Sequence, residues 1–157
     1  MKITLLVIGK TDSFWLAEGI SDYVKRLNHY INFEIEVIPD IKKSKKVGVE
    51  QQKQMEGELI LARNFSGKEL HLFDEKGKMF TSREFAGFLE KKMVSGLKEL
   101  VLAIGGPFGF SNHVYEAANA KISLSAGTFS HQMVRLMCVE QIYRAFTIIK
   151  GEPYHHD

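Results

Sequence analysis

The sequence contains very little cysteine and no long apolar run. Cys138 is the single cysteine among 157 residues, so no disulfide can form within the chain. This excludes a disulfide scaffold and a cysteine-based zinc site, and it suits a reducing compartment. No segment reaches the ~18 uninterrupted apolar residues of a membrane span, and the apolar run at residues 3–8 is too short for a signal-peptide core. We therefore expect a cytoplasmic protein without a membrane partner.

An excess of charge of either sign is also absent, because 21 Lys and Arg against 19 Asp and Glu give 21 − 19 = +2. So small a net charge is, taken alone, weak evidence for a nucleic-acid partner. Hydrophobic residues make up 45% and charged residues 25% of the chain, which is an ordinary globular composition and excludes disorder. The length predicts one domain spanning residues 1–157.

Strand-like apolar runs alternate along the chain with segments of helical periodicity. The runs at residues 2–9 and 99–104 are typical of strands buried on both faces of a parallel sheet. This alternation predicts an α/β fold with a mostly parallel sheet flanked by helices. The expected strands cover residues 2–9, 32–38, 69–73, 99–104 and 121–124. Helices are expected after Asp12 or Ser13, after Thr81, and over about residues 49–64, 112–120 and 132–150.

One helix start and one turn have clear local signals. Thr81 followed three residues later by Glu84 predicts a capping box, and Gly96 fits the end of the same helix. Residues 74–78, which include Gly77, are typical of a turn after the third strand.

The last predicted helix, at about residues 132–150, is apolar on nearly every side. Such a helix must be buried, either inside its own fold or against a partner. Arg135, Glu140 and Arg144 argue against a membrane span. A small domain can hardly surround this helix alone, so we favour a subunit interface. The alternative is burial wholly within the fold.

Two loops that contain glycine follow predicted strands. Residues 105–109 (GGPFG) precede a helix, and ligands of open α/β sheets bind beyond the carboxyl ends of the strands. Their spacing is not the dinucleotide fingerprint, and the chain has no P-loop. Residues 123–129 (SLSAGTF) offer a second set of backbone groups. The alternatives are a tight structural turn for the first loop and an ordinary loop, capped by Ser130, for the second.

Polar residues near the C-terminus form a further candidate site. Glu140 and Arg144 share a helix face because they lie four residues apart, either as a structural ion pair or as part of a site. The tail with Tyr154 and His155 is either disordered or folds over a site, where both rings can stack on a base. No His, Asp or Glu grouping has metal-ligand spacing, so we expect no metal. A basic loop either grips RNA phosphates or is merely solvated, and it comprises Lys42, Lys43, Lys45 and Lys46.

Five motifs together resemble one known family over the whole chain. They are KITLLVIGK (residues 2–10), IGGPFGF (104–110), SLSAGTFSHQMVR (123–135), EQIYRAF (140–146) and GEPYHHD (151–157). Their order and the chain length are similar to those of the ribosomal RNA large-subunit methyltransferase H family, of the SPOUT class. The resemblance implies a C-terminal trefoil knot, which periodicity alone would not suggest because knots are nearly absent from proteins.

The resemblance also implies an activity and a set of site residues. Members of this family use S-adenosyl-L-methionine to methylate N3 of a pseudouridine in helix 69 of 23S ribosomal RNA, on assembled ribosomes, and they work as homodimers. The family's cofactor contacts correspond to Phe73, Gly105, Leu124, Ser125, Ala126, Gly127, Thr128 and Phe129. Its substrate-side catalytic positions correspond to Glu140, Arg144, Tyr154 and His155, and the tail completes the site of the other subunit.

The chain departs from the family pattern at three positions. Phe73 and Phe110 stand where leucine is expected, and Ser130 replaces a proline. Phe73 can still present its backbone to adenine. The acceptor nitrogen must lose a proton at or near methyl transfer, and Glu140, His155 and water are the candidates for the base.

Two other functions compete with this one. A different SPOUT enzyme would modify another nucleotide, which mapping of the methylated base would reveal. A non-catalytic α/β module that binds a small ligand or RNA would transfer no methyl group from labelled S-adenosylmethionine to ribosomes. The coincidence of two glycine-containing loops with a Tyr-His tail favours the enzyme.

Overall fold

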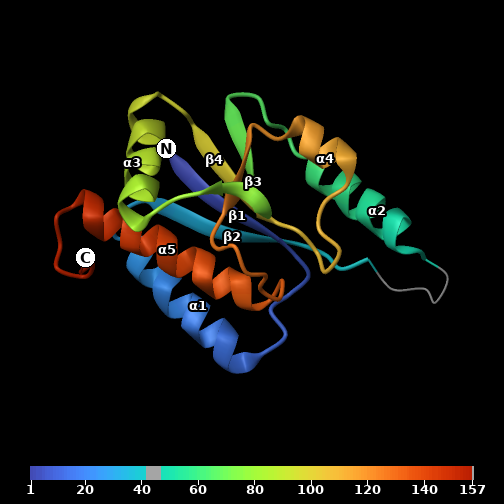
Figure 1. The fold of residues 1–157 in the computed structure, drawn as a ribbon, viewed down its shortest axis with the longest axis horizontal. Coiled ribbons are helices and arrows are strands. Elements are labelled where there is room, and N and C mark those ends of the chain that lie inside the picture. The colour runs from blue at the N-terminus through green and yellow to red at the C-terminus, as the bar shows by residue number, and fades with distance from the viewer. Residues whose placement is uncertain (42–46, 157) are drawn as a thin grey trace.

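A computed structural model describes residues 1–41 and 47–156 and shows a central sheet covered by helices on both faces (Figure 1). The predicted α/β class is confirmed. The strands are β1 (Lys2–Ile8), β2 (Asn32–Ile38), β3 (Lys68–Met79), β4 (Glu99–Ile104) and β5 (Ala120–Ser123). The helices are α1 (Phe14–Leu27), α2 (Val49–Leu61), α3 (Ser82–Val94), α4 (Asn112–Ala117) and α5 (Met133–Ile149). The predicted basic loop, Lys42 to Lys46, lies outside the described residues.

The sheet has the strand order β2-β1-β4-β3-β5, and its four strand pairings are parallel. Alternate residues of β1 serve the two faces, as the period of a strand requires. Ile3, Leu5 and Val7 join the core beneath α1, α3 and α5, whereas Leu6 and Ile8 join the core beneath α2 and α4 (Figure 1). Helices on both faces explain why β1 and β4 are apolar along most of their length.

The predicted turn at residues 74–78 is wrong, because β3 continues through it to Met79. The pairing of β3 with β5 shifts register between Phe73 and Lys78, so the intervening residues form a bulge. Gly77 passes so close to β5 that a Cβ there would lie 2.5 Å from the carbonyl carbon of Ile122. Residues 74–78, whose composition is typical of a turn, therefore form a bulge within β3 and do not end the strand.

The boundaries of the helices are otherwise close to those expected. The predicted capping box is confirmed, since Glu84 N–H donates to the Thr81 hydroxyl and Thr81 N–H donates to the Glu84 carboxylate. Helix α4 ends three residues earlier than predicted because Asn119 pairs with β3 instead. Its N–H donates to the Leu70 carbonyl at 2.8 Å, and Leu70 N–H donates to its side-chain oxygen at 2.8 Å.

Helix α5 lies between α1 and α3 on one face of the sheet (Figure 1). Its Arg135 is 1% exposed, and its guanidinium donates to the carbonyls of Ile8 at 2.5 Å and Gly9 at 2.9 Å. The helix start is therefore tied to the end of β1 by a buried charge. Met133 and Met137, on another side of α5, remain 37% exposed. The fold thus buries much of this apolar helix but not all of it.

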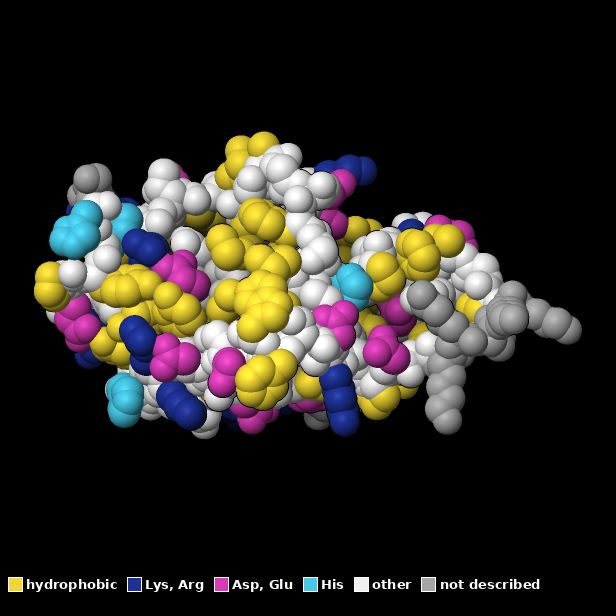
Figure 2. All heavy atoms as spheres, turned by 90° about the horizontal axis from the view of Figure 1, so that it is seen from below, with side chains coloured by type: hydrophobic (Ala, Val, Ile, Leu, Met, Phe, Trp, Pro, Cys, Tyr) yellow, Lys and Arg dark blue, Asp and Glu magenta, His cyan; other side chains and the backbone are white. Residues whose placement is uncertain are grey.

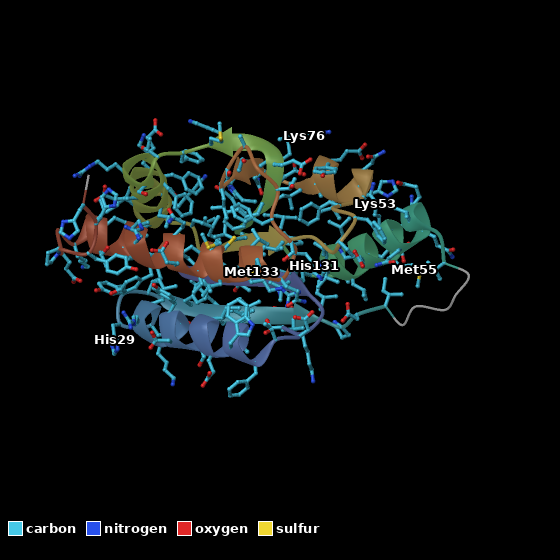
Figure 3. The ribbon with its side chains drawn as sticks, turned by 60° about the horizontal axis from the view of Figure 1, so that its bottom comes forward. His29, Lys53, Met55, Lys76, His131 and Met133 are labelled. Atoms are coloured by element: carbon cyan, nitrogen blue, oxygen red, sulfur yellow. The ribbon has the colours of Figure 1, made fainter. Side chains whose placement is uncertain are left out.

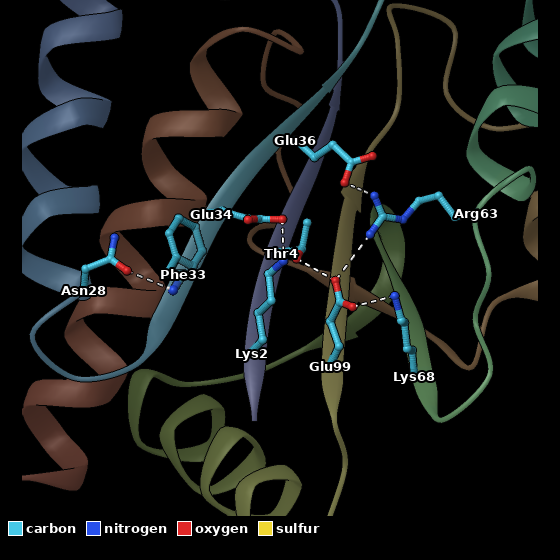
Figure 4. Close-up of polar contacts among 9 residues, drawn as sticks. All are labelled: Lys2, Thr4, Asn28, Phe33, Glu34, Glu36, Arg63, Lys68 and Glu99. Atoms are coloured by element: carbon cyan, nitrogen blue, oxygen red, sulfur yellow. Dashed lines mark hydrogen bonds and ion pairs between the residues drawn. The ribbon is translucent and has the colours of Figure 1, made fainter.

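Charged side chains close the edge of the sheet where β1, β3 and β4 begin (Figure 4). Glu99 accepts hydrogen bonds from Thr4 at 2.7 Å and from Lys68 at 2.7 Å, and Arg63 bridges Glu99 and Glu36. Burial opposes ionisation of Glu99, but the hydrogen bonds from Lys68 and Thr4 keep the pKa of its carboxyl below the usual value. This edge is filled by ion pairs, which leaves the opposite, carboxyl edge for a ligand.

Candidate functional site

A cavity of about 550 Å³ lies at the carboxyl edge of the sheet. Phe73 marks the point where β3 leaves β4, Ile104 ends β4, and Leu124 follows β5. The remaining wall comes from the bulged part of β3, from the loops after β4 and β5, from Tyr115 of α4 and from the start of α5. The lining residues are Phe73, Asp74, Glu75, Lys76, Ile104, Gly105, Gly106, Pro107, Phe108, Gly109, Phe110, Tyr115, Leu124, Ser125, Gly127, Thr128, Phe129, Ser130, His131 and Val134.

The first glycine-containing loop is a tight turn that also lines the cavity. Gly109 N–H donates to the Gly106 carbonyl at 3.1 Å, and Gly109 has a φ of 78°. A Cβ on Gly105 would lie 3.1 Å from the carbonyl carbon of Gly109, and one on Gly106 would lie 2.5 Å from a carboxylate oxygen of Glu56. A side chain at residue 105 or 106 would therefore crowd its neighbours, and at these two positions backbone groups form the wall.

The second loop is organised by its own serines. The Ser123 hydroxyl donates to the Ser125 carbonyl at 2.8 Å, and the Ser125 hydroxyl accepts from Gly127 N–H at 2.9 Å. The Ser130 hydroxyl accepts from Met133 N–H at 3.1 Å just before α5, although the N-cap residue of that helix is Gln132, which makes no side-chain capping hydrogen bond. All the cofactor positions carried over from the family line the cavity except Ala126, which is exposed in the same loop.

Among the polar cavity residues that were not assigned from the sequence are two that contact each other. Asp74 and Tyr115 both line the cavity, and the Tyr115 hydroxyl donates to the Asp74 carboxylate at 2.5 Å. Burial, followed by the hydrogen bond to Asp74, raises the pKa of Tyr115 above its usual value. The sequence does place Asp74 directly after the apolar residues of a predicted strand, where ligands of parallel sheets bind. Because residues 74–78 were interpreted as a turn, Asp74 was not considered as a site residue.

The four substrate-side residues lie in contact with one another. Arg144 donates to Oε1 of Glu140 through Nε at 3.1 Å and through Nη2 at 2.5 Å. Tyr154 donates its hydroxyl to the same oxygen at 3.1 Å, and its ring lies 4.9 Å from the Arg144 guanidinium carbon. Arg144 Nη1 is 3.4 Å from Nδ1 of His155. The helix pair and the tail therefore form one polar cluster.

The C-terminal tail is held down by tyrosines that sequence reasoning did not single out. Tyr154 packs edge-on against Tyr143 with 4.8 Å between ring centroids, and its hydroxyl lies 3.1 Å from that of Tyr23. Tyr30 donates to Glu152 at 2.5 Å, a hydrogen bond that raises the pKa of Tyr30 to about 12. The tail thus folds over α5 and α1, and the alternative of a disordered tail is wrong for residues 151–156.

The polar cluster and the cavity are separate within one chain. None of the four substrate-side residues lines the cavity. Val134 does, and Arg144 lies ten residues farther along α5, or about 15 Å at 1.5 Å per residue. A reaction that uses both the cavity and the polar cluster therefore requires a second copy of the chain or another partner to bring them together.

An apolar face joins the two regions. Figure 2 shows apolar side chains in a band across the middle of the face that α1 and α5 form. Exposed large apolar residues on these helices include Phe14, Trp15, Met133 and Met137, and Leu136 of α5 packs over Gly19 of α1. The cavity residue His131 lies two residues before Met133, the first residue of α5 (Figure 3). The apolar face therefore reaches the rim of the cavity.

The described residues contain neither a candidate metal site nor a helix suited to cross a membrane. No three His, Cys, Asp or Glu side chains within residues 1–41 and 47–156 are grouped so that they could hold a metal ion. In the same part of the chain, no helix is long and apolar enough to cross a membrane.

Comparison with known proteins gives a consistent result over the full length. A family model described as "Predicted SPOUT methyltransferase" matches residues 1–155. A protein of Parabacteroides distasonis named "Ribosomal RNA large subunit methyltransferase H" is 59% identical over 157 residues, which is 100% of both chains. Proteins of the same name from Porphyromonas gingivalis and Flavobacterium psychrophilum are 53% identical over 100% of both chains and 56% identical over 99% of both chains, respectively.

Proposed function

The chain belongs to the SPOUT methyltransferase family, and from this premise we propose that it methylates 23S ribosomal RNA. The proposed donor is S-adenosylmethionine, and the proposed acceptor is N3 of a pseudouridine in helix 69 of assembled ribosomes. The observation that carries the proposal is the cavity between two glycine-containing loops at the carboxyl edge of a parallel sheet. We further propose that residues 1–157 form a single domain that acts in the cytoplasm, where ribosomes are. The trefoil knot implied by the family resemblance stays a prediction.

The cavity suits a cofactor of this size and chemistry. Its volume of about 550 Å³ falls within the range of small-molecule sites. We propose that Phe73, Gly105 and the loop from Leu124 to Phe129 hold the cofactor, largely through backbone groups. When bound, S-adenosylmethionine supplies a methyl group that its positively charged sulfur has already activated. The task of these residues is then to orient donor and acceptor in line and to exclude water.

The substrate-side cluster is proposed to hold the target nucleotide. Glu140 accepts hydrogen bonds at both carboxylate oxygens, Oε1 from Arg144 and Tyr154 and Oε2 from Gln141. Its proposed role is therefore to fix Arg144 and Tyr154 in place. Tyr154 and His155 offer rings that stack on an unpaired base, and Arg144 offers a charge for a phosphate. The proton on N3 of the pseudouridine is transferred to a base, and the candidates for this base are His155, Glu140 and water.

We propose that the enzyme is a homodimer in which the tail of one subunit completes the cavity of the other. About 15 Å separates the two parts of the site along α5 in one chain. The apolar face of α1 and α5 reaches the cavity rim, and patches of this kind mark protein interfaces. In the proposed dimer, two copies pair through this face so that the cluster of one subunit lies beside the cavity of its partner.

Calorimetry tests the cofactor directly. The chain lacks the dinucleotide fingerprint, so S-adenosylmethionine should bind and NAD should release no heat. Binding of NAD alone would contradict the proposal.

Methyl transfer tests the reaction. Assembled ribosomes should accept labelled methyl groups, and mapping should place them on one pseudouridine of helix 69. Label on another nucleotide would identify a different RNA methyltransferase. No transfer, despite cofactor binding, would support the non-catalytic binding module.

A further inference from the structure

The bulge in β3 aims a carboxylate into the cavity. Up to Phe73 the strand pairs with both β4 and β5, and it regains its register with β5 only at Lys78. Bulges of this kind redirect side chains and are common beside active sites. Asp74 is the first residue of the bulge and lines the cavity, where it is half-buried.

Two hydrogen bonds fix the orientation of this carboxylate. Oδ1 of Asp74 accepts from Lys76 N–H at 2.8 Å within the bulge, and Oδ2 accepts from the Tyr115 hydroxyl at 2.5 Å. An ionised carboxylate has about four lone-pair positions, so these two donors leave acceptor capacity at each oxygen. Asp74 is therefore held in place and still able to accept hydrogen bonds from a ligand.

Tyr115 is itself locked by its neighbours. Its ring meets that of Phe110 edge-on with 5.8 Å between centroids, and Lys121 Nζ lies 5.5 Å from its ring centroid on another side. The first glycine-containing loop also passes close, since a Cβ on Gly109 would lie 3.9 Å from the hydroxyl oxygen. A tyrosine packed in this way holds its hydroxyl, and with it the carboxylate, in one position.

We propose that Asp74 is a cofactor-binding residue and that Tyr115 is its positioning residue. Asp74 accepts hydrogen bonds from a donor group of S-adenosylmethionine, either the ribose hydroxyls or the ammonium group. This inference rests on the proposed function. It adds a side-chain acceptor to a site otherwise built from backbone groups.

Cofactor affinity in three variants tests the inference. Asp74→Asn should weaken binding of S-adenosylmethionine about 10- to 100-fold, the range for loss of a hydrogen bond to a charged group. Tyr115→Phe should weaken it less, and the double variant should be no weaker than Asp74→Asn because both changes remove one interaction. Glu116→Gln is the matched control, since this exposed carboxylate on α4 does not line the cavity and its loss should leave affinity unchanged.

Kinetics separate positioning from a merely structural role. Tyr115→Phe removes one oxygen atom from a packed ring and should raise the KM for the cofactor while kcat at saturating cofactor stays within about threefold. A structural role would instead lower the melting temperature and leave KM unchanged. If Asp74→Asn does not fold, the KM shift of Tyr115→Phe still decides the question.

Fragments of the cofactor identify the donor group. A loss of affinity that Asp74→Asn shows equally for 5′-methylthioadenosine assigns the ribose. A loss shown only for S-adenosylmethionine and S-adenosylhomocysteine assigns the ammonium group, and a loss confined to S-adenosylmethionine would overturn the hydrogen-bonding role. Wild-type protein that binds no S-adenosylmethionine would overturn the proposed function. Wild-type affinity in both Asp74→Asn and Tyr115→Phe would overturn this inference alone.

Discussion

At the scale of single residues, the fit of Gly106 against Glu56 sets the position of the first glycine-containing loop. A Cβ at residue 106 would lie 2.5 Å from one Glu56 carboxylate oxygen and 2.9 Å from the other. Gly106→Ala should therefore destabilise the fold by about 1–3 kcal/mol, the usual cost of overpacking, and weaken cofactor binding. Urea unfolding and calorimetry measure the two effects. Gly87→Ala on α3, where a Cβ meets nothing within 4 Å, should be neutral or stabilising.

Two buried carboxyl groups, those of Glu56 and Glu99, should make the free energy of unfolding depend on pH in opposite directions. Burial, together with the charge of Asp40, raises the pKa of Glu56 above its ordinary value of 4.5, although Gln52 donates a hydrogen bond to it. Its contribution is complete below pH 4.5 and is lost as pH rises through the folded-state pKa. Glu56→Gln should therefore gain stability relative to wild type between pH 4 and pH 8.

Glu99 should behave in the opposite way because its pKa is lowered. Its contribution is present above pH 4.5 and is lost as pH falls through the folded-state pKa. Glu99→Gln should thus cost more stability at pH 7 than at pH 3. Unfolding free energies measured across this range decide both cases, and parallel curves for wild type and the variants would contradict them.

At the scale of elements, the capping box of α3 should carry measurable stability. Thr81 accepts the Glu84 N–H hydrogen bond at 3.2 Å, and its own N–H donates to Glu84 at 2.7 Å. Thr81→Ala should cost about 1 kcal/mol, whereas Thr81→Ser keeps the hydroxyl and should cost much less. Equal unfolding midpoints for the two variants would show that the cap contributes nothing.

The buried guanidinium of Arg135 joins α5 to the end of β1. Arg135→Met keeps much of the side-chain volume but leaves the carbonyls of Ile8 and Gly9 without these donors. Each buried carbonyl left unpaired costs about 1–3 kcal/mol, so this variant should lose at least ~2 kcal/mol of unfolding free energy. Arg144→Met, on the more exposed cluster, should lose less stability but more activity. Equal stability losses would contradict this assignment.

Local sequence patterns predicted the helices and strands well, but they did not predict contacts between segments that are far apart in the sequence. The apolar runs of β1 and β4 and the Thr81 capping box are encoded by neighbouring residues, and all are present. The continuation of β3 depends on β5, which lies more than forty residues farther along the chain. A local reading of Asp-Glu-Lys-Gly could only indicate a turn.

The candidate site divides in the same way. The two loops were placed beyond strand ends by a general rule of α/β sheets, and the resemblance supplied their residues. Asp74 went unassigned because its exposure to the cavity follows from the bulge. The tail's attachment went unassigned because Tyr23 and Tyr30 reach it from the other end of the chain.

At the scale of the whole molecule, the protein should be a dimer that one charge can split. Met137 is 37% exposed on the apolar face of α5. Met137→Glu should give a monomer and abolish methyl transfer, because an unpaired charge in an interface is costly. Val94→Glu places the same charge on an 80% exposed residue of α3 and should leave the dimer intact. Light scattering that shows a wild-type monomer at micromolar concentration would contradict the dimer.

Removal of the tail should separate cofactor binding from catalysis. Tyr154 and His155 do not line the cavity of their own chain. Deletion of residues 153–157 should therefore leave affinity for S-adenosylmethionine nearly intact while methyl transfer falls at least ~100-fold. A truncated enzyme with the normal rate would show that the tail is only a folded end.

Methyl transfer by a mixed dimer tests the composite site most directly. One subunit lacks the tail, and the other carries Gly106→Ala, which weakens cofactor binding, so both homodimers should be far less active than wild type at limiting cofactor. In the heterodimer, the intact tail of the second subunit meets the intact cavity of the first, and labelled methyl transfer to ribosomes should return to about half the wild-type rate, because one of two sites is complete. Heterodimers that demonstrably form but transfer no methyl groups would show that each tail serves its own subunit.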